Sequence, residues 1–66
     1  MFLPTGEVFF IKKDNTLDKV MNSDISSLKE LQEEINYLFN KCGYNKNNFI
    51  GAKYVYNGKT IYEIEF

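Results

Sequence analysis

The sequence predicts a small α+β domain with the element order ββαββ or βαββ, in which one helix packs on one face of a mainly antiparallel sheet. Three observations support this prediction. Apolar residues recur at helical spacing between residues 27 and 43, β-forming residues cluster on both sides of that segment, and an Asn-Gly pair divides the C-terminal cluster. The 66 residues suffice for a single domain, 1–66, which buries only about 60% of the surface that its unfolded chain exposes.

The helix is expected to begin at residue 24 or 27 and to end at residue 42. Its apolar stripe consists of Leu28, Leu31, Ile35, Leu38 and Cys42, widened by Phe39. Ser27 and Glu30 have the spacing of a capping box, in which the serine oxygen accepts an amide and the carboxylate reaches back to the serine amide. Gly43 marks the end of the helix. As the last member of the stripe, Cys42 is expected to be a small core residue and not a reactive thiol.

Two strands are expected before the helix. The run EVFFIKK at residues 7–13 has four consecutive β-forming residues, which favours a strand in the middle of the sheet. Asp14 and Asn15 have turn chemistry, so residues 16–22 are expected to return as a second strand. The alternative for residues 16–22 is a short helical turn capped by Thr16.

Residues 49–56 and 59–66 flank Asn57-Gly58, the strongest short signal for a β-hairpin. Counting outward from a two-residue turn pairs Tyr56 with Lys59, Tyr54 with Ile61, and so on to Phe49 with Phe66. One face of this hairpin would carry Phe49, Gly51, Lys53, Val55, Tyr62, Ile64 and Phe66. The other face would carry Ile50, Ala52, Tyr54, Tyr56, Ile61, Glu63 and Glu65.

The helix is expected to cover the first of these faces, where Gly51 would permit its close approach. The uncovered face then presents an apolar patch with a charged rim, which is typical of a contact surface. The predicted partner-binding residues are Ile50, Tyr54, Tyr56, Ile61, Glu63 and Lys59, with Glu65 beside them. Cross-strand pairs that only stabilise an open sheet, or a symmetric dimer that buries the patch, would use the same residues.

Composition excludes several classes of function. The chain has no histidine, one cysteine, and no Gly-rich phosphate loop, so we expect no catalysis, no metal site and no cofactor. All eight basic residues are lysines, which disfavours a conventional nucleic-acid binder, because arginine supplies most specific contacts to guanine and phosphate. No run of 18 apolar residues is present, and Met1-Phe-Leu-Pro does not resemble a signal peptide, so a cytoplasmic location without membrane association is expected.

The functional hypothesis is a non-catalytic protein-binding module, most plausibly a phage or mobile-element accessory protein that inhibits or redirects a host protein through its open sheet face. Lysine without arginine and eight asparagines suggest AT-rich coding, which low-GC bacteria and their phages share. A short reading frame that starts at methionine is expected for such an accessory protein, although a domain excised from a protein of a low-GC host would look similar.

Two alternative functions remain open. A single-stranded nucleic-acid platform would combine Lys41, Lys46, Lys53 and Lys59 with Tyr44, Tyr54 and Tyr56. A small structural or oligomerising subunit would bury the apolar patch between copies. A secondary acidic ridge of Glu30, Glu33 and Glu34 could imitate nucleic-acid phosphates, but carboxylates in the first turns of a helix also complement its dipole.

Overall fold

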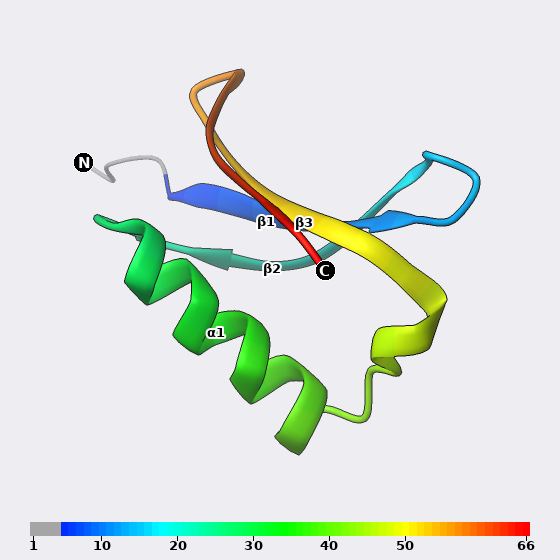
Figure 1. Ribbon diagram of the computed structural model, residues 1–66. Helices are drawn as coiled ribbons and strands as arrows, with labels where there is room; N and C mark the ends of the chain where they lie inside the picture. The colour runs from blue at the N-terminus through cyan, green and yellow to red at the C-terminus, as the bar shows by residue number, and fades with distance from the viewer. Residues whose placement is uncertain (1–4) are drawn as a thin grey trace.

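The computed structural model describes residues 5–66, and Met1–Pro4, on which the absence of a signal peptide was judged, lie outside the described residues. The order of elements is ββαββ, with a short 3-10 turn before the second hairpin (Figure 1). The elements are β1 (Gly6–Lys12), β2 (Leu17–Ser23), α1 (Leu28–Lys41), η1 (Lys46–Asn48), β3 (Phe49–Tyr56) and β4 (Lys59–Glu65). The predicted α+β class is therefore confirmed.

The four strands form one antiparallel sheet in the order β2-β1-β3-β4, and α1 packs against one face of it (Figure 1). Buried and half-buried residues alternate along β1, whereas β3 has two adjacent buried residues, Gly51 and Ala52, next to a register shift at Ile50. Val8 and Phe10 of β1 are fully buried, as is Ala52 of β3, and they meet the three buried residues of the helix, which are Leu31, Ile35 and Leu38. The prediction that residues 7–13 form a strand in the middle of the sheet is confirmed.

Phe10 lies at the centre of an aromatic cluster that connects the helix with the open end of the second hairpin, where Phe49 and Phe66 lie. Its ring centroid lies 5.1 Å from that of Phe39, 4.7 Å from Phe49 and 6.0 Å from Phe66. Aromatic rings bury large areas and gain additional energy from offset or edge-on contacts. These rings therefore add to the burial that stabilises a chain whose single cysteine cannot form an internal disulfide.

The ends of α1 follow from its caps. Ser27 is the N-cap and its hydroxyl accepts the Glu30 amide at 3.2 Å, as predicted. The Glu30 carboxylate does not return to Ser27, however. It accepts the Ser26 amide at 3.1 Å and the Ser26 hydroxyl at 2.7 Å, one residue earlier. Gly43 follows the helix with a φ of 78°, a conformation that glycine adopts without strain.

The predicted apolar stripe is longer than the surface that it covers. Leu28 is 44% exposed and Cys42 is exposed, because only the central turns of the helix lie over the sheet. Cys42 is the C-cap, and its amide donates to the Leu38 carbonyl. The expectation that Cys42 is a core residue is wrong.

The register of the second hairpin differs from the predicted one through a single extra residue. Tyr56 pairs with Lys59 and Val55 with Thr60, as expected, but Tyr54 then pairs with Tyr62, so that Ile61 is left as a bulge. A bulge shifts every later pair by one position. It allows Tyr54 of β3 and Tyr62 of β4 to point to the same face.

The predicted division of β3 between the two faces is wrong from Gly51 to Val55, whereas Phe49 packs against the core as predicted. Ala52 and Tyr54 face the helix and are 0% and 3% exposed, whereas Lys53 and Val55 lie on the opposite face. Gly51 does not permit close approach of the helix. Its neighbours are the Ile64 backbone and Ile11, and it pairs with Ile11 on the face away from α1. Tyr62 and Ile64 of β4 do face the core as predicted, and they pack against the buried cluster.

Candidate functional site

The face of the sheet opposite α1 is covered by no element among residues 5–66 (Figure 1). The strand registers place Phe9 and Ile11 of β1 on this face, with Val55 of β3 and Leu17 of β2 beside them. Leu17 is 45% exposed, and the other three are half-buried. These four side chains lie on one face of three adjacent strands, and we call them the open-face band. Lys19 and Lys53 are the register partners of Phe9, and Glu7 is that of Val55.

A shallow hollow of about 370 Å³ lies at one end of this band. Ile11, Ile50 and Gly51 contribute apolar lining, and Glu63 and Glu65 line the same hollow from β4. Gly51 itself is buried, and the Ile64 backbone lies directly over its Cα, so the apolar surface offered here is that of the Ile11 and Ile50 side chains. Carboxylates next to an apolar surface favour a lysine or arginine side chain. Its methylene groups can pack on the apolar residues while its charged end pairs with a carboxylate.

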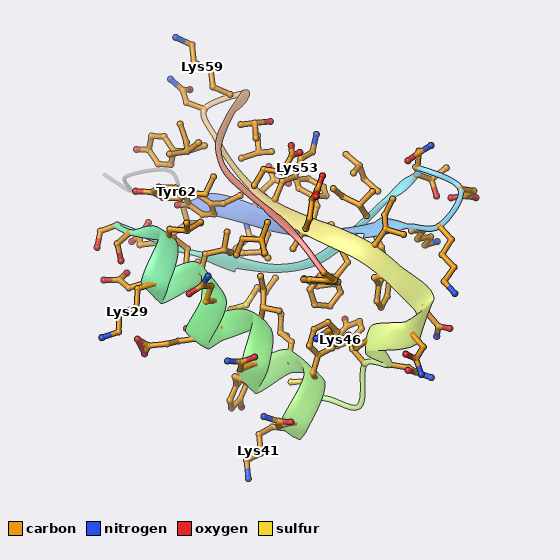
Figure 2. The ribbon with its side chains drawn as sticks, in the orientation of Figure 1. Lys29, Lys41, Lys46, Lys53, Lys59 and Tyr62 are labelled. Carbon is orange, nitrogen blue, oxygen red and sulfur yellow. The ribbon has the colours of Figure 1, made fainter. Side chains whose placement is uncertain are left out.

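Charged side chains alternate around the open-face band. Lys19 lies 3.4 Å from Glu7, and both side chains are more than 40% exposed. Lys53 is the register partner of Glu63 and extends from the sheet on the side away from the helix (Figure 2). Because the Lys19–Glu7 pair is exposed, it adds little to stability.

The six predicted partner-binding residues do not form one patch. Tyr54 is buried in the core, and Lys59 lies at the tip of the hairpin (Figure 2). Ile50 and Glu63 line the hollow of the open face. Tyr56 and Ile61 lie at the other end of the hairpin, where they line an apolar pocket of about 450 Å³ with Tyr54, Asp24, Ile25 and Ser26. The structure thus divides the predicted set between two ends of the molecule.

Two tyrosines of the core face hold the linker between β2 and α1. The Tyr54 hydroxyl accepts the buried Ile25 amide at 3.2 Å, and the Tyr62 hydroxyl donates to the Ser26 carbonyl at 3.0 Å. Their rings stack with centroids 6.2 Å apart. Gly6 leaves room for this arrangement, since a Cβ there would overlap the Tyr54 ring. These tyrosines position the start of the helix and are not free to bind a partner.

The residues of the proposed acidic ridge lie on α1. Glu30 and Glu33 are exposed and Glu34 is half-buried. The pKa of Glu30 is lowered, first by the hydrogen bond from the Ser26 hydroxyl and second by that from the Ser26 amide. Because this carboxylate is already held by Ser26, the ridge retains two carboxylates, Glu33 and Glu34, whose oxygens accept none of the hydrogen bonds found among residues 5–66.

The lysines of the nucleic-acid alternative lie far apart on the chain's surface. Lys41 ends the helix, Lys46 begins η1, Lys53 extends from the open face and Lys59 lies at the hairpin tip (Figure 2). Tyr54 is buried and Tyr44 packs edge-on against Phe10. A base-stacking platform needs exposed rings beside the cations, and Phe9 is the ring that the open face provides.

A second, larger cleft of about 810 Å³ lies between the C-terminal half of α1 and the end of β4. Three carboxamide side chains, Gln32, Asn36 and Asn40, follow one another at four-residue spacing along its helix side. Ile64, Phe39, Tyr44 and Phe66 provide its apolar lining, and Lys46 is the one charged residue among those that line it within residues 5–66.

Sequence analysis did not single out the band residues Phe9 and Ile11, because it treated EVFFIKK as one run of β-forming residues and did not divide it between two faces. The signal was present in the period-2 alternation. Charged Glu7 shares a face with Phe9 and Ile11, whereas Val8 and Phe10 alternate with them. A charged member of one alternating set indicates that this set faces solvent.

No family model matches this chain, and neither curated proteins nor solved structures include one significantly similar to it. Among residues 5–66, no three His, Cys, Asp or Glu side chains gather as they would around a metal ion. The helix α1 has 14 residues, fewer than a bilayer span requires, and the described part of the chain contains no longer helix. The function must therefore be inferred from the surfaces themselves.

Proposed function

We propose that this protein is a non-catalytic protein-binding module that contacts its partner through the face of the sheet opposite α1. The observation that carries the proposal is the open-face band of Phe9, Ile11, Leu17 and Val55, with Lys19, Lys53 and Glu7 in register beside Phe9 and Val55. Binding energy in protein interfaces is concentrated in a few apolar anchors, and charged residues at the rim select the partner.

The hollow beside Gly51 defines the chemistry of one contact. A lysine or arginine of the partner can lay its stem over Ile11 and Ile50 and bring its charge to Glu63 or Glu65. Two carboxylates at one hollow disfavour an acidic partner segment at the same place. The partner surface is therefore expected to be apolar with at least one basic anchor.

The narrower expectation of a phage-type accessory protein that inhibits or redirects a host protein is part of this proposal. It is supported by the amino-acid composition, in which lysine without arginine and eight asparagines suggest AT-rich coding. It predicts a cytoplasmic target in a low-GC bacterial host.

The test is affinity capture from a low-GC bacterial lysate, followed by binding of the purified candidate. The variant Phe9→Ser/Val55→Ser removes two apolar anchors from the open face. The matched control is Leu28→Ser/Tyr37→Ser, which removes two exposed apolar side chains from the helix. A partner retained by the control and by the unaltered protein, and lost by the open-face variant, supports the proposal.

Three outcomes would contradict it. Equal binding by both variants places the interface elsewhere. Material that disappears on nuclease treatment, and whose retention falls steeply with salt, favours the nucleic-acid alternative. Recovery of the protein alone as a concentration-dependent dimer, abolished by Phe9→Ser/Val55→Ser, favours the oligomerising alternative.

A further inference from the structure

The outer edge of β4 is free within the part of the chain that the structure describes. The sheet order β2-β1-β3-β4 makes β4 an edge strand, and it pairs with β3 alone among the described strands. An edge strand presents a row of unpaired amides and carbonyls, onto which another strand can add. This edge has seven residues, Lys59–Glu65, and is long enough to receive a short peptide.

The direction of the backbone groups on β4 follows from one hydrogen bond. The Phe66 amide donates to the Ile50 carbonyl at 3.0 Å, so this residue directs its backbone groups inward to β3. In an antiparallel pair, successive residues direct their backbone groups to opposite sides. The amides and carbonyls of Glu63 and Glu65 therefore point outward, away from β3.

The side chains of these same two residues determine which strand can add. Glu63 and Glu65 pair with Lys53 and Gly51, so both carboxylates lie on the open face of the sheet. Like charges directly opposite one another in a sheet are destabilising. If β4 of a second copy added antiparallel here, its glutamates would lie opposite these, and charge therefore disfavours pairing of two β4 edges.

On its other face, an added strand would meet the cleft between β4 and α1. Its side chains on the helix side would enter a space of about 810 Å³ lined by Phe39, Phe66 and Ile64. Across that space lie the carboxamides of Gln32, Asn36 and Asn40, which can both donate and accept hydrogen bonds. Three carboxamides spaced by four residues extend over about 12 Å of helix, which corresponds to about four residues of extended peptide.

We propose that the free edge of β4 binds an extended peptide segment as a fifth strand, and that this segment alternates basic and apolar residues. The basic side chains lie opposite Glu63 and Glu65 on the open face, and the apolar side chains enter the cleft beside α1. The inference rests on the proposed protein-binding function and specifies the chemistry of one segment of the partner.

The direct test is to titrate the protein with synthetic peptides whose termini are blocked, and to monitor binding through the amide chemical shifts of the protein. The probe is a six-residue peptide in which lysine and valine alternate, and its counterpart alternates glutamate and valine. The lysine peptide should bind about tenfold more tightly than the glutamate peptide. Its lysines attract Glu63 and Glu65, whereas glutamates at the same positions would repel them. The largest shifts should occur at the amides of Glu63 and Glu65 and along Gln32, Asn36 and Asn40, with β2 unchanged.

Two further experiments distinguish the contribution of backbone hydrogen bonds to peptide binding from that of charge. A lysine–valine peptide that is N-methylated at alternate amides should lose binding when the methyl groups replace the donors that face β4. The variant Glu63→Lys/Glu65→Lys should reverse the preference, so that the glutamate peptide binds more tightly. This variant changes only exposed side chains, and circular dichroism verifies that it is folded.

The contribution of the cleft is tested by filling it. Asn36→Trp should weaken the lysine peptide at least tenfold, whereas Tyr37→Trp, at the next residue and outside the lining of the cleft, should leave its affinity unchanged. Equal affinity for the two peptides, shifts confined to β2, or an unaltered preference in Glu63→Lys/Glu65→Lys would each overturn the inference. So would self-association that the lysine peptide does not displace.

The two proposals can fail separately. Phe9→Ser/Val55→Ser changes the open-face band and leaves the outer edge of β4 intact, so peptide binding should persist in that variant. Loss of peptide selectivity with retained, Phe9-dependent capture would overturn this inference and leave the proposed function standing. Selective peptide binding at β4 without any Phe9-dependent partner would overturn the proposed use of the open face.

Discussion

At the residue scale, the hydroxyl of Tyr54 has a role that its position in the sequence does not suggest. It is the acceptor for the amide of Ile25, which is 9% exposed, and it lies where a Cβ on Gly6 would be. Leaving a buried amide without an acceptor costs more free energy than a typical intramolecular hydrogen bond contributes to stability. The tyrosine therefore has a structural function that a serine could not replace.

Replacing Tyr54 by phenylalanine should lower the free energy of unfolding by about 1–3 kcal/mol, because the Ile25 amide loses its acceptor. Tyr56→Phe is the matched control, since the Tyr56 hydroxyl makes none of the hydrogen bonds found among residues 5–66, and its effect should be within about 0.5 kcal/mol. Urea denaturation measures both values. A Tyr54→Phe protein as stable as the Tyr56→Phe protein would show that the linker is not held in this way.

Glu30 gives the fold a dependence on pH in the acid range. Its pKa is lowered from the ordinary value of 4.5, first by the Ser26 hydroxyl. A carboxylate with a lowered folded pKa stabilises the protein fully above its unfolded pKa, and this contribution is lost as the pH falls through the folded value. Glu30→Gln should therefore be less stable than the unaltered protein at pH 7, and the difference should shrink as the pH falls below 4.5.

Denaturation at a series of pH values measures this difference. Asp14, whose pKa is lowered mainly by the Thr16 hydroxyl, is present in both proteins, so its own loss of stabilisation cancels in the comparison. A difference that is constant between pH 7 and pH 3 would contradict the role assigned to the Ser26–Glu30 pair.

At the scale of elements, β1 separates the two faces of the sheet through two adjacent phenylalanines. Phe10 is fully buried, whereas Phe9 is half-buried on the open face. Phe10→Ala should cost about 3–5 kcal/mol, which approaches the total stability of a domain of this size. Phe9→Ala should cost about 1 kcal/mol, because little close-packed volume is removed. Circular dichroism and urea denaturation of both variants measure the contrast, and equal losses would contradict the assignment of faces.

The helix and the hairpin turn could be predicted because their signals are local. Ser27 and Gly43 bound the helix through caps, and Asn57, with a φ of 54°, and Gly58, with a φ of 79°, supply the turn that two-residue hairpins need. These residues determine their own backbone geometry. Their effect can therefore be inferred without knowledge of the rest of the fold.

The faces of the hairpin could not be predicted, because the bulge at Ile61 has no local signal. With or without it, β4 alternates Tyr62, Ile64 and Phe66 with two glutamates, so the apolar face of β4 was assigned correctly. The bulge only changes which residues of β3 share that face. Core packing determines which residues of β3 face the helix, and it places Tyr54 against the linker between β2 and α1. For this reason the residues predicted to form one binding patch lie in separate places.

Gly51 shows how closely β3 and β4 approach. A Cβ at this position would lie 2.6 Å from the Ile64 carbonyl oxygen, which belongs to the backbone and cannot rotate away. Gly51→Ala should therefore cost about 1–3 kcal/mol and shift the amide resonances of β4. Gly43→Ala is the control. A Cβ at Gly43 would meet no neighbour, but the φ of 78° should make the substitution cost about 1–2 kcal/mol. The amide resonances of β4 should not shift in this variant. An unaltered β4 spectrum in Gly51→Ala would contradict this packing.

At the scale of the whole molecule, residues 5–66 form one sheet and one α-helix, and that helix can cover only one face of the sheet. Its core contains eight buried apolar residues among those described, and its remaining apolar groups lie on the open face and in the cleft beside β4. A domain this small gains relatively little from its own core. A partner that covers the open face would add stability in proportion to its occupancy, by mass action.

The claim that the open face is the binding surface is tested most directly by hydroxyl-radical footprinting of the protein alone and in complex with its captured partner. Oxidation of Phe9 should fall in the complex, whereas Tyr37, which is 56% exposed on the helix, should be oxidised equally in both. Phe10 provides an internal control, because it is buried in both states. Protection of Tyr37 with unchanged oxidation of Phe9 would contradict the account and would place the partner on α1.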